Sequence, residues 1–239
     1  KIIKIADKVG KMVVATGDVH YLNPEDKVFK EDNDIKDYKK LTGKIEINNL
    51  SFGYSKLAEP LIQGFSLKLE PGKTVALVGS SGCGKSTMSK LISGLQKPWG
   101  GEILFDGKKL SHSEIKIGYL PEERGLYLNS SVNDQLKYFA ALNNMNRNEA
   151  AKAIDDYLDI FQIKDLKKRK VKTLSKGNKQ KIQFIAAILH DPDLIILDEP
   201  FSGLDPVNTD ILKKVIIDLV KKGKYIIIKE KEICIFKIA

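Results

Sequence analysis

The order of hydrophobic and polar positions predicts an alternation of strands and helices over most of the chain. Two segments alternate with a period of two, as half-buried strands do: KIEINNLSFGY (44–54) and LIQGFSLKLEPG (61–72). Other strands are expected at short apolar runs, namely TVALVG (74–79), GEILFDG (101–107), LIILD (194–198) and YIII (225–228).

Helical patterns separate these expected strands. They cover residues 85–95, two segments within about 131–161, and residues 175–190 and 209–221. Because strands alternate with helices in this way, the pattern predicts an α/β fold.

Composition narrows the class of protein. The chain has 239 residues, of which 42% are hydrophobic and 30% are charged, as in a soluble globular protein with a real core. No apolar run approaches the ~18 residues that a membrane span needs. Two cysteines do not indicate a disulfide framework, so a reducing compartment is expected.

The net charge of +9 is compatible with nucleic acid, anionic lipid or nucleotide partners. The densest basic run, KDLKKRKVK (164–172), contains no aromatic residues. We therefore interpret it as a solvated helix end and loop, and expect no specific nucleic-acid partner.

The segment GSSGCGKST (79–87) has the pattern G-x-x-x-x-G-K-[ST] between an expected buried strand and an expected helix. Its backbone N–H groups and the positive helix end can hold phosphates, whereas a glycine-rich turn without a ligand is the alternative. Lys85 is expected to reach the β- and γ-phosphates, and the Ser86 hydroxyl to bind Mg²⁺. The expected nucleotide-binding residues of this loop are Gly79, Ser80, Ser81, Gly82, Cys83, Gly84, Lys85, Ser86 and Thr87.

Two carboxylates follow the apolar run LIIL (194–197). Asp198 stands at the end of this expected strand, where it can hold Mg²⁺ directly or through water. The adjacent Glu199 can polarise the water that attacks the γ-phosphate. The alternative for this pair is helix capping.

A second anion site is suggested by LSKGN (174–178) at the start of an expected amphipathic helix. Ser175 can cap that helix, and Gly177 lets a ligand approach its backbone. Many helices begin with Ser-x-Gly, so this signal is weak by itself.

Together, GSSGCGKST, LSKGNKQ, LIILDEP and SGLDP resemble, in order and spacing, the ATP-binding cassette of ABC transporters over residues 44–228. The resemblance implies a P-loop NTPase of ABC type, with a mixed sheet core, a small antiparallel β subdomain and a helical subdomain at about 125–178. It also implies a head-to-tail dimer in which each ATP is held by one subunit's phosphate loop and the other's signature turn.

The resemblance assigns further roles. The signature turn is usually L-S-G-G-Q; Ser175 and Gly177 match it, whereas Lys176 and Asn178 are substitutions. Tyr54 is implied to stack on adenine, with core packing as its alternative role. Asp205 matches the loop that couples the two ATP sites.

Two positions differ from the usual residues of the family. Glu122 stands where a switch glutamine senses the γ-phosphate and meets the membrane partner. Lys231 stands where a histidine contacts the γ-phosphate and supports hydrolysis.

Different segments of the chain resemble different protein families, so the chain is interpreted as a composite. Residues 10–29 resemble part of the PHP domain of a Gram-positive DNA polymerase III, in which Asp18 and His20 would be metal ligands. The remaining ligands of that metal cluster are not recognised, so residues 1–43 are expected to be an appended segment and linker. Residues 44–239 are expected to be the cassette, with a truncated or altered C-terminus.

Within the cassette, residues 53–72 and 95–107 resemble peptide or bacteriocin exporters. Residues 117–140 and 182–208 resemble stand-alone subunits of sodium or drug exporters.

We expect a subunit that binds Mg-ATP, forms a homodimer or heterodimer of cassettes, and hydrolyses ATP to drive export through a separate transmembrane permease. Glu199, Lys85 and Glu122 are the expected catalytic residues, and Ser86 and Asp198 the expected metal ligands. The expected location is cytoplasmic, on the inner face of the cell membrane. The alternatives are a cassette that binds nucleotide but turns over poorly, an ATPase acting on DNA or ribosomes, and a PHP-type phosphoesterase.

Overall fold

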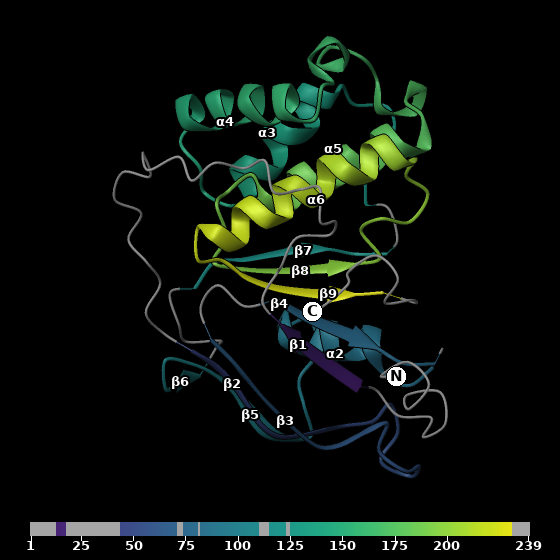
Figure 1. Ribbon diagram of the computed structural model, residues 1–239, viewed down its shortest axis with the longest axis vertical. Coiled ribbons are helices and arrows are strands. Elements are labelled where there is room, and N and C mark those ends of the chain that lie inside the picture. The colour runs from purple at the N-terminus through teal and green to yellow at the C-terminus, as the bar shows by residue number, and fades with distance from the viewer. Residues whose placement is uncertain are drawn as a thin grey trace. The chain divides into compact units, whose positions relative to one another are not determined.

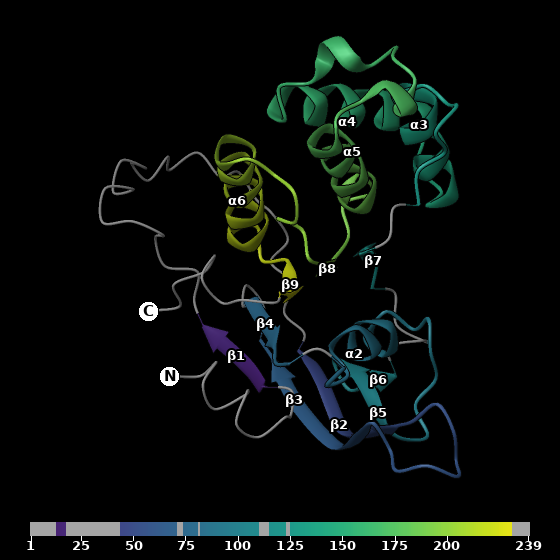
Figure 2. The same ribbon diagram turned by 90° about the vertical axis from the view of Figure 1, so that its right-hand side faces the viewer.

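The computed structural model of the protein describes residues 13–17, 44–70, 74–80, 82–109, 115–122 and 125–230. They belong to two compact units, which are described separately. The first comprises residues 1–115 and 219–239, and the second comprises residues 116–218. Their helices and strands are labelled in Figures 1 and 2.

The first unit contains a four-stranded antiparallel sheet of order β3-β2-β5-β6. Its strands are β2 (Ile45–Phe52), β3 (Ile62–Leu69), β5 (Gly100–Phe105) and β6 (Lys108–Lys109). The expected strands at β2, β3 and β5 are confirmed. The register of β2 shifts after Ile47, so the alternation of buried side chains resumes at Leu50 rather than at Asn49.

A second set of strands in this unit is centred on β4 (Thr74–Val78). β9 (Tyr225–Lys229) runs parallel to β4, and β1 (Val13–Gly17) runs antiparallel to it. Every residue of β9 is buried, as in strands covered on both faces. β4 leads directly into the phosphate loop and α2 (Lys85–Ile92).

The second unit combines helices with two parallel strands, β7 (Ile117–Leu120) and β8 (Leu194–Asp198). Its helices are α3 (Val132–Leu142), α4 (Arg147–Ile160), α5 (Lys176–Ile188) and the larger part of α6 (Pro206–Lys221). Figures 1 and 2 show α3, α4 and α5 lying close together. Between α4 and α5 the rings of Phe161 and Phe184 are buried, with centroids 5.8 Å apart.

The helices of this unit begin where polar side chains can accept hydrogen bonds from free N–H groups. Ser131 accepts from the N–H of Asp134 at the start of α3, and Asn146 accepts from the N–H of Asn148 at the start of α4. The predicted helices within 131–161 and 175–190 are thus confirmed. α6 begins at Pro206, three residues before the predicted start, since proline is favourable in a first helical turn.

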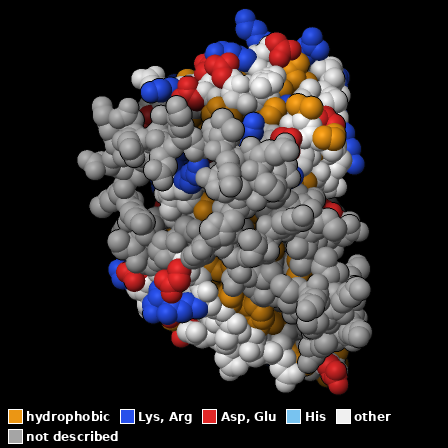
Figure 3. All heavy atoms as spheres, in the orientation of Figure 1, with side chains coloured by type: hydrophobic (Ala, Val, Ile, Leu, Met, Phe, Trp, Pro, Cys, Tyr) orange, Lys and Arg blue, Asp and Glu red, His pale blue; other side chains and the backbone are white. Residues whose placement is uncertain are grey.

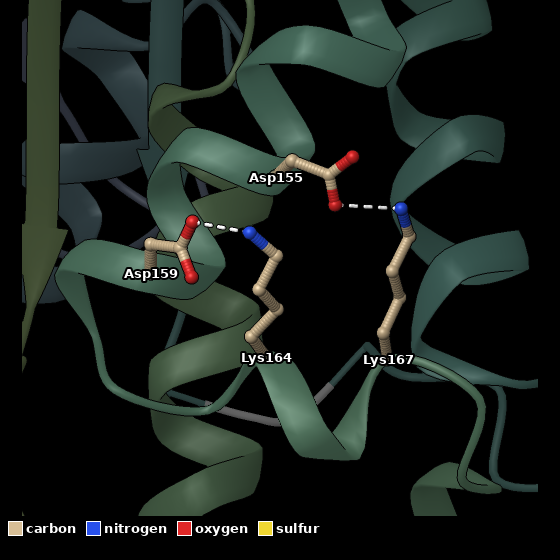
Figure 4. A network of polar contacts seen from close by, with 4 residues as sticks. All are labelled: Asp155, Asp159, Lys164 and Lys167. Carbon is tan, nitrogen blue, oxygen red and sulfur yellow. Dashed lines mark hydrogen bonds and ion pairs between the residues drawn. The ribbon is translucent and has the colours of Figure 1, made fainter.

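The basic run 164–172 forms two short 3-10 helices, η3 (Lys164–Leu166) and η4 (Val171–Thr173). Lys164 pairs with Asp159 at 2.5 Å and Lys167 with Asp155 at 2.6 Å, which ties this run to α4 (Figure 4). The hydrogen bond from Lys167 lowers the pKa of Asp155 below its ordinary value. Acidic and basic side chains are intermixed at the upper end of the view in Figure 3.

Candidate functional site: a phosphate loop, a carboxylate cluster and a signature turn

The phosphate loop connects β4 to α2 in the first unit. Its glycines make the sharp turn possible: Gly82 and Gly84 have φ values of 83° and 97°, which other residues rarely adopt. Gly84 is the N-cap of α2, and the first turn of this helix contains no acidic residue. The N–H groups at the helix start therefore present a positive end to the loop.

The Lys85 ammonium lies against this loop. Its Nζ donates hydrogen bonds to the carbonyl oxygens of Gly79 (2.7 Å) and Ser80 (2.8 Å), and lies 3.8 Å from Cys83 Sγ. Only 7% of Lys85 is exposed. A buried cation held by carbonyl dipoles can exchange these acceptors for phosphate oxygens, which bind an ammonium more strongly.

Tyr54 is attached to the same loop by its hydroxyl group. Its Oη lies 2.9 Å from Thr87 Oγ1, and its ring meets Phe52 edge to face at 5.3 Å. The residue is 69% exposed, so it is not a core residue, and its ring can stack on an adenine base.

Trp99 was not found by sequence reasoning. A Cβ atom at Gly53 would lie 2.5 Å from the indole, so Trp99 covers the backbone beside Tyr54. Gly53 and Trp99 are more than forty positions apart in the sequence. No local sequence motif therefore predicts their contact.

The second unit brings three predicted carboxylates together. Ligand oxygens of Glu122, Asp198 and Glu199 all lie within 4.8 Å of one another. The carboxylates lie close together because β7 and β8 are parallel and Leu120 pairs with Leu197. The residues that follow the two strands therefore begin at the same edge of the sheet. Asp198 is 2% exposed, and Glu199 adopts a left-handed φ of 48°. Such backbone strain is typical of functional sites.

Two side chains of α5 hold the loops that carry these carboxylates. Gln183 donates to the carbonyl of Pro121 at 3.1 Å, and Gln180 donates to the carbonyl of Pro200 at 3.2 Å. α5 approaches β7 closely because Gly118 has no side chain: a Cβ there would lie 2.2 Å from the Ala187 carbonyl oxygen. The positions of the carboxylates thus depend on the helix that begins at the signature turn.

The signature turn and the SGLDP loop (202–206) are in contact. Ser175 Oγ accepts a hydrogen bond from the Asn178 N–H and caps α5, as predicted. A Cβ at Gly177 would lie 3.6 Å from Leu204 and 3.8 Å from Asn208. The turn backbone therefore lies close to the loop.

Asp205 caps α6 in the same loop. Its carboxylate accepts hydrogen bonds from the backbone N–H and the side-chain amide of Asn208. The backbone hydrogen bond is the main reason that the pKa of Asp205 lies below its ordinary value.

The predicted site residues therefore form two groups. The phosphate-loop residues and Tyr54 lie together in the first unit, whereas the carboxylates, the signature turn and Asp205 lie together in the second. Four residues singled out from the sequence, Ser81, Lys231, Asp18 and His20, lie outside the described residues.

The donor types suit the ligands that the motifs predict. A carboxylate cluster and a serine hydroxyl offer the hard oxygen ligands that Mg²⁺ prefers. The phosphate loop offers N–H groups and an ammonium for polyphosphate.

Comparisons with known proteins agree with this geometry. The family profile for ABC transporters matches residues 62–202, which is more than half of the chain. The ABC transporter ATP-binding protein YhaQ of Bacillus subtilis is 48% identical over 163 residues, covering 68% of this chain and 55% of YhaQ. MJ1023 of Methanocaldococcus jannaschii, an ABC transporter ATP-binding protein, is 41% identical over 192 residues. The alignment covers 80% of this chain and 69% of MJ1023.

A solved structure of an ATP-binding subunit of an ABC transporter has a TM-score of 0.70 and 28% identity, and covers 78% of this chain and 79% of that chain. The fold is thus that of an ABC-type P-loop ATP-binding domain. The chain belongs to the ABC transporter family. Among the described residues, no helix is both long and apolar enough to cross a membrane.

Proposed function

We propose that this protein is an ATP-binding subunit that binds Mg-ATP, dimerises head to tail and hydrolyses ATP to drive export through a separate membrane permease. The observation that carries the proposal is the Lys85 ammonium inside a phosphate loop, in a chain that also clusters Glu122, Asp198 and Glu199. The chain spans 55% of YhaQ and 57% of a second relative, so the activity of the whole protein is part of this proposal.

Binding of the nucleotide is assigned to the first unit. Tyr54 stacks on the base, with its hydroxyl held by Thr87. Lys85 leaves the carbonyls of Gly79 and Ser80 and binds the β- and γ-phosphates, while the loop N–H groups hold the remaining oxygens.

The metal ligands are assigned to Ser86 and Asp198. Glu122 belongs to the same carboxylate cluster as Asp198. Bound Mg²⁺ neutralises part of the phosphate charge. Glu199 orients a water molecule and accepts its proton as the water attacks the γ-phosphate. The buried position of Glu199 strengthens this interaction, because few solvent molecules compete for the carboxylate.

The partners are assigned from the resemblance. Ser175 and the backbone of Gly177 complete the ATP site of a second copy or a related cassette. A permease in the membrane supplies the pathway for the substrate, which places this subunit on the cytoplasmic face. Export is supported by the resemblance of residues 117–140 and 182–208 to subunits of sodium or drug exporters.

A second candidate is a cassette that binds and dimerises on ATP but turns over poorly. It is supported by Lys231, which stands where the family usually has a histidine.

The first test is steady-state Mg-ATP turnover by the purified chain beside the variant Glu199→Gln. We expect phosphate release that falls by about 10²-fold or more in the variant, while ATP binding is retained. Equal release from both proteins would refute the role of Glu199. Binding of ATP without release by the parent chain would favour the second candidate.

A further inference from the structure

Trp99 stands at the point where β2 and β5 meet. It directly precedes Gly100, the first residue of β5, and its backbone N–H donates a hydrogen bond to the carbonyl oxygen of Ser51 in β2 at 2.8 Å. Ser51 and Gly100 are also partners in the antiparallel sheet. The sheet therefore fixes the backbone from which the indole extends, although 40% of the residue is exposed.

The indole lies over the backbone of Gly53. A Cβ at this position would lie 2.5, 3.0 and 3.1 Å from three carbon atoms of the six-membered ring. Gly53 does not have a positive φ, so its backbone conformation does not require glycine. The close approach of the Trp99 ring requires it instead, since any side chain would occupy the same space.

The contact extends from Gly53 to the ring of Tyr54. Phe52 is 7% exposed, and the centroid of its ring lies 6.2 Å from that of Trp99 and 5.3 Å from that of Tyr54. Tyr54 meets Phe52 edge to face, and its hydroxyl lies 2.9 Å from Thr87 Oγ1. The exposed ring of Tyr54 thus rests on a buried ring that Trp99 supports.

This support affects how strongly a base can be bound. An exposed tyrosine loses rotamer freedom when a ligand stacks on its ring. A ring that neighbouring side chains already hold in the binding orientation loses less, and the affinity rises accordingly.

We propose that Trp99 is a positioning residue for the nucleotide base, because it holds residues 52–54 so that the Tyr54 ring is ready to stack on adenine. This inference rests on the stacking of Tyr54 in the proposed function. Trp99 acts through Gly53 and Phe52 rather than by touching the nucleotide. It therefore contributes to the affinity for the base and not to the affinity for the phosphate chain.

The test compares two ligands on the full chain, with Glu199→Gln as the parent so that bound ATP is not consumed. ATP reports on base and phosphates together, and inorganic tripolyphosphate reports on the phosphate loop alone. Both affinities are measured by titration calorimetry with Mg²⁺. Trp99→Leu removes the indole, and Trp99→Phe keeps an aromatic ring. Leu95→Ala is the matched control, because it removes an exposed apolar side chain from the same connection between α2 and β5.

We expect Trp99→Leu to weaken ATP binding by about threefold to tenfold, the cost of ordering one side chain on binding. Its affinity for tripolyphosphate stays within about twofold of the parent value, as does every affinity of the Leu95→Ala variant. Trp99→Phe loses less ATP affinity than Trp99→Leu.

Gly53→Ala tests the same contact from the other side. Its methyl group occupies the space of the indole, so this variant also weakens ATP binding and leaves tripolyphosphate binding unchanged. Gly100→Ala is its control, because a Cβ at Gly100 has nothing within 4 Å. If Trp99→Leu does not fold, Trp99→Phe and Gly53→Ala decide by the same comparison of the two ligands.

A background of Tyr54→Ala separates an action through Tyr54 from a direct one. This substitution alone weakens ATP binding by about tenfold or more, the usual worth of a base stacked on an aromatic ring. Trp99→Leu then adds no further loss, since the ring that it positions is gone.

Equal ATP affinities of parent and Trp99→Leu would overturn the inference and leave the proposed function intact. Equal losses for ATP and tripolyphosphate would also overturn it, since Trp99 would then support the fold of the phosphate loop. A loss that persists in the Tyr54→Ala background would show that Trp99 does not act through Tyr54. If Tyr54→Ala binds ATP like the parent, base stacking itself is wrong, and the inference fails with that part of the proposed function.

Discussion

At the scale of single residues, the Lys85 ammonium is the polar group around which the atoms of the phosphate loop gather. Lys85 Nζ contacts two backbone carbonyls and approaches the half-buried Cys83 thiol, so this thiol is part of the loop that would close around phosphates. Access of a reagent to Cys83 therefore reports on occupancy of the site.

We predict that saturating Mg-ATP slows alkylation of Cys83 by N-ethylmaleimide. The measurement uses a Cys234→Ser variant, in which Cys83 is the single thiol of the chain. At ~100 times the dissociation constant nearly all sites are occupied, so the labelling rate should fall by about tenfold or more. A Lys85→Met variant, which binds phosphate weakly, should lose the protection. Equal labelling rates with and without nucleotide would place the thiol outside the phosphate site.

At the scale of secondary-structure elements, the packing of α5 on β7 determines where Glu122 lies. The Gly118 backbone touches the Ala187 carbonyl of the helix, and Gln183 of the same helix holds Pro121. A side chain at position 118 would push helix and strand apart.

We predict that Gly118→Ala lowers the free energy of unfolding by about 1–3 kcal/mol, the usual cost of overpacking. Gly125→Ala is the matched control, because a Cβ at Gly125 has nothing within 4 Å and should change stability by less than about 0.5 kcal/mol. Urea unfolding followed by circular dichroism measures both. Equal stability of the two variants would show that α5 and β7 separate without cost.

The same elements show how far sequence patterns predict the fold. The strands at β2, β4, β8 and β9 and the helix α5 were predicted, because their apolar positions follow clear periods. β7 was not predicted: it has four residues, and Gly118 interrupts its apolar run. Strands this short are specified by their partners, here β8 and α5, rather than by local pattern.

The candidate site shows the same limit. Motif spacing predicted Lys85, Asp198, Glu199 and Ser175, since the chemistry of a phosphate site requires these residue types at fixed intervals. Contacts between distant segments, such as Trp99 over Gly53 and Lys176 along Gly203, have no motif. They follow from tertiary packing and could only be found in the structure.

At the scale of the whole molecule, the proposed function needs both units and a second copy. The first unit supplies the phosphate loop, and the second supplies the carboxylates and the signature turn. The assignment of residues 1–43 as an appended segment remains a prediction, although β1 within it pairs with β4. Under the proposed function, turnover is a property of an assembly, and its rate depends on every group that reaches the γ-phosphate.

Lys231 stands where the family usually has a histidine that contacts the γ-phosphate, so we expect this residue to affect the rate of ATP turnover. An ammonium has three donors and no acceptor, whereas the imidazole of histidine can donate at one nitrogen and accept at the other near neutral pH. We predict that Lys231→His raises the ATP turnover number by about tenfold or more, within the range that one well-placed donor contributes to catalysis, with little change in ATP affinity. Single-turnover phosphate release measures the chemical step directly.

The double variant Glu199→Gln with Lys231→His is the control, because a gain that depends on Glu199 must belong to this site. Lys231→Ala distinguishes the roles of the lysine. If it lowers turnover while Lys231→His brings no gain, then the native ammonium already stabilises the γ-phosphate. The prediction would be wrong, and the lysine would be an effective replacement for histidine.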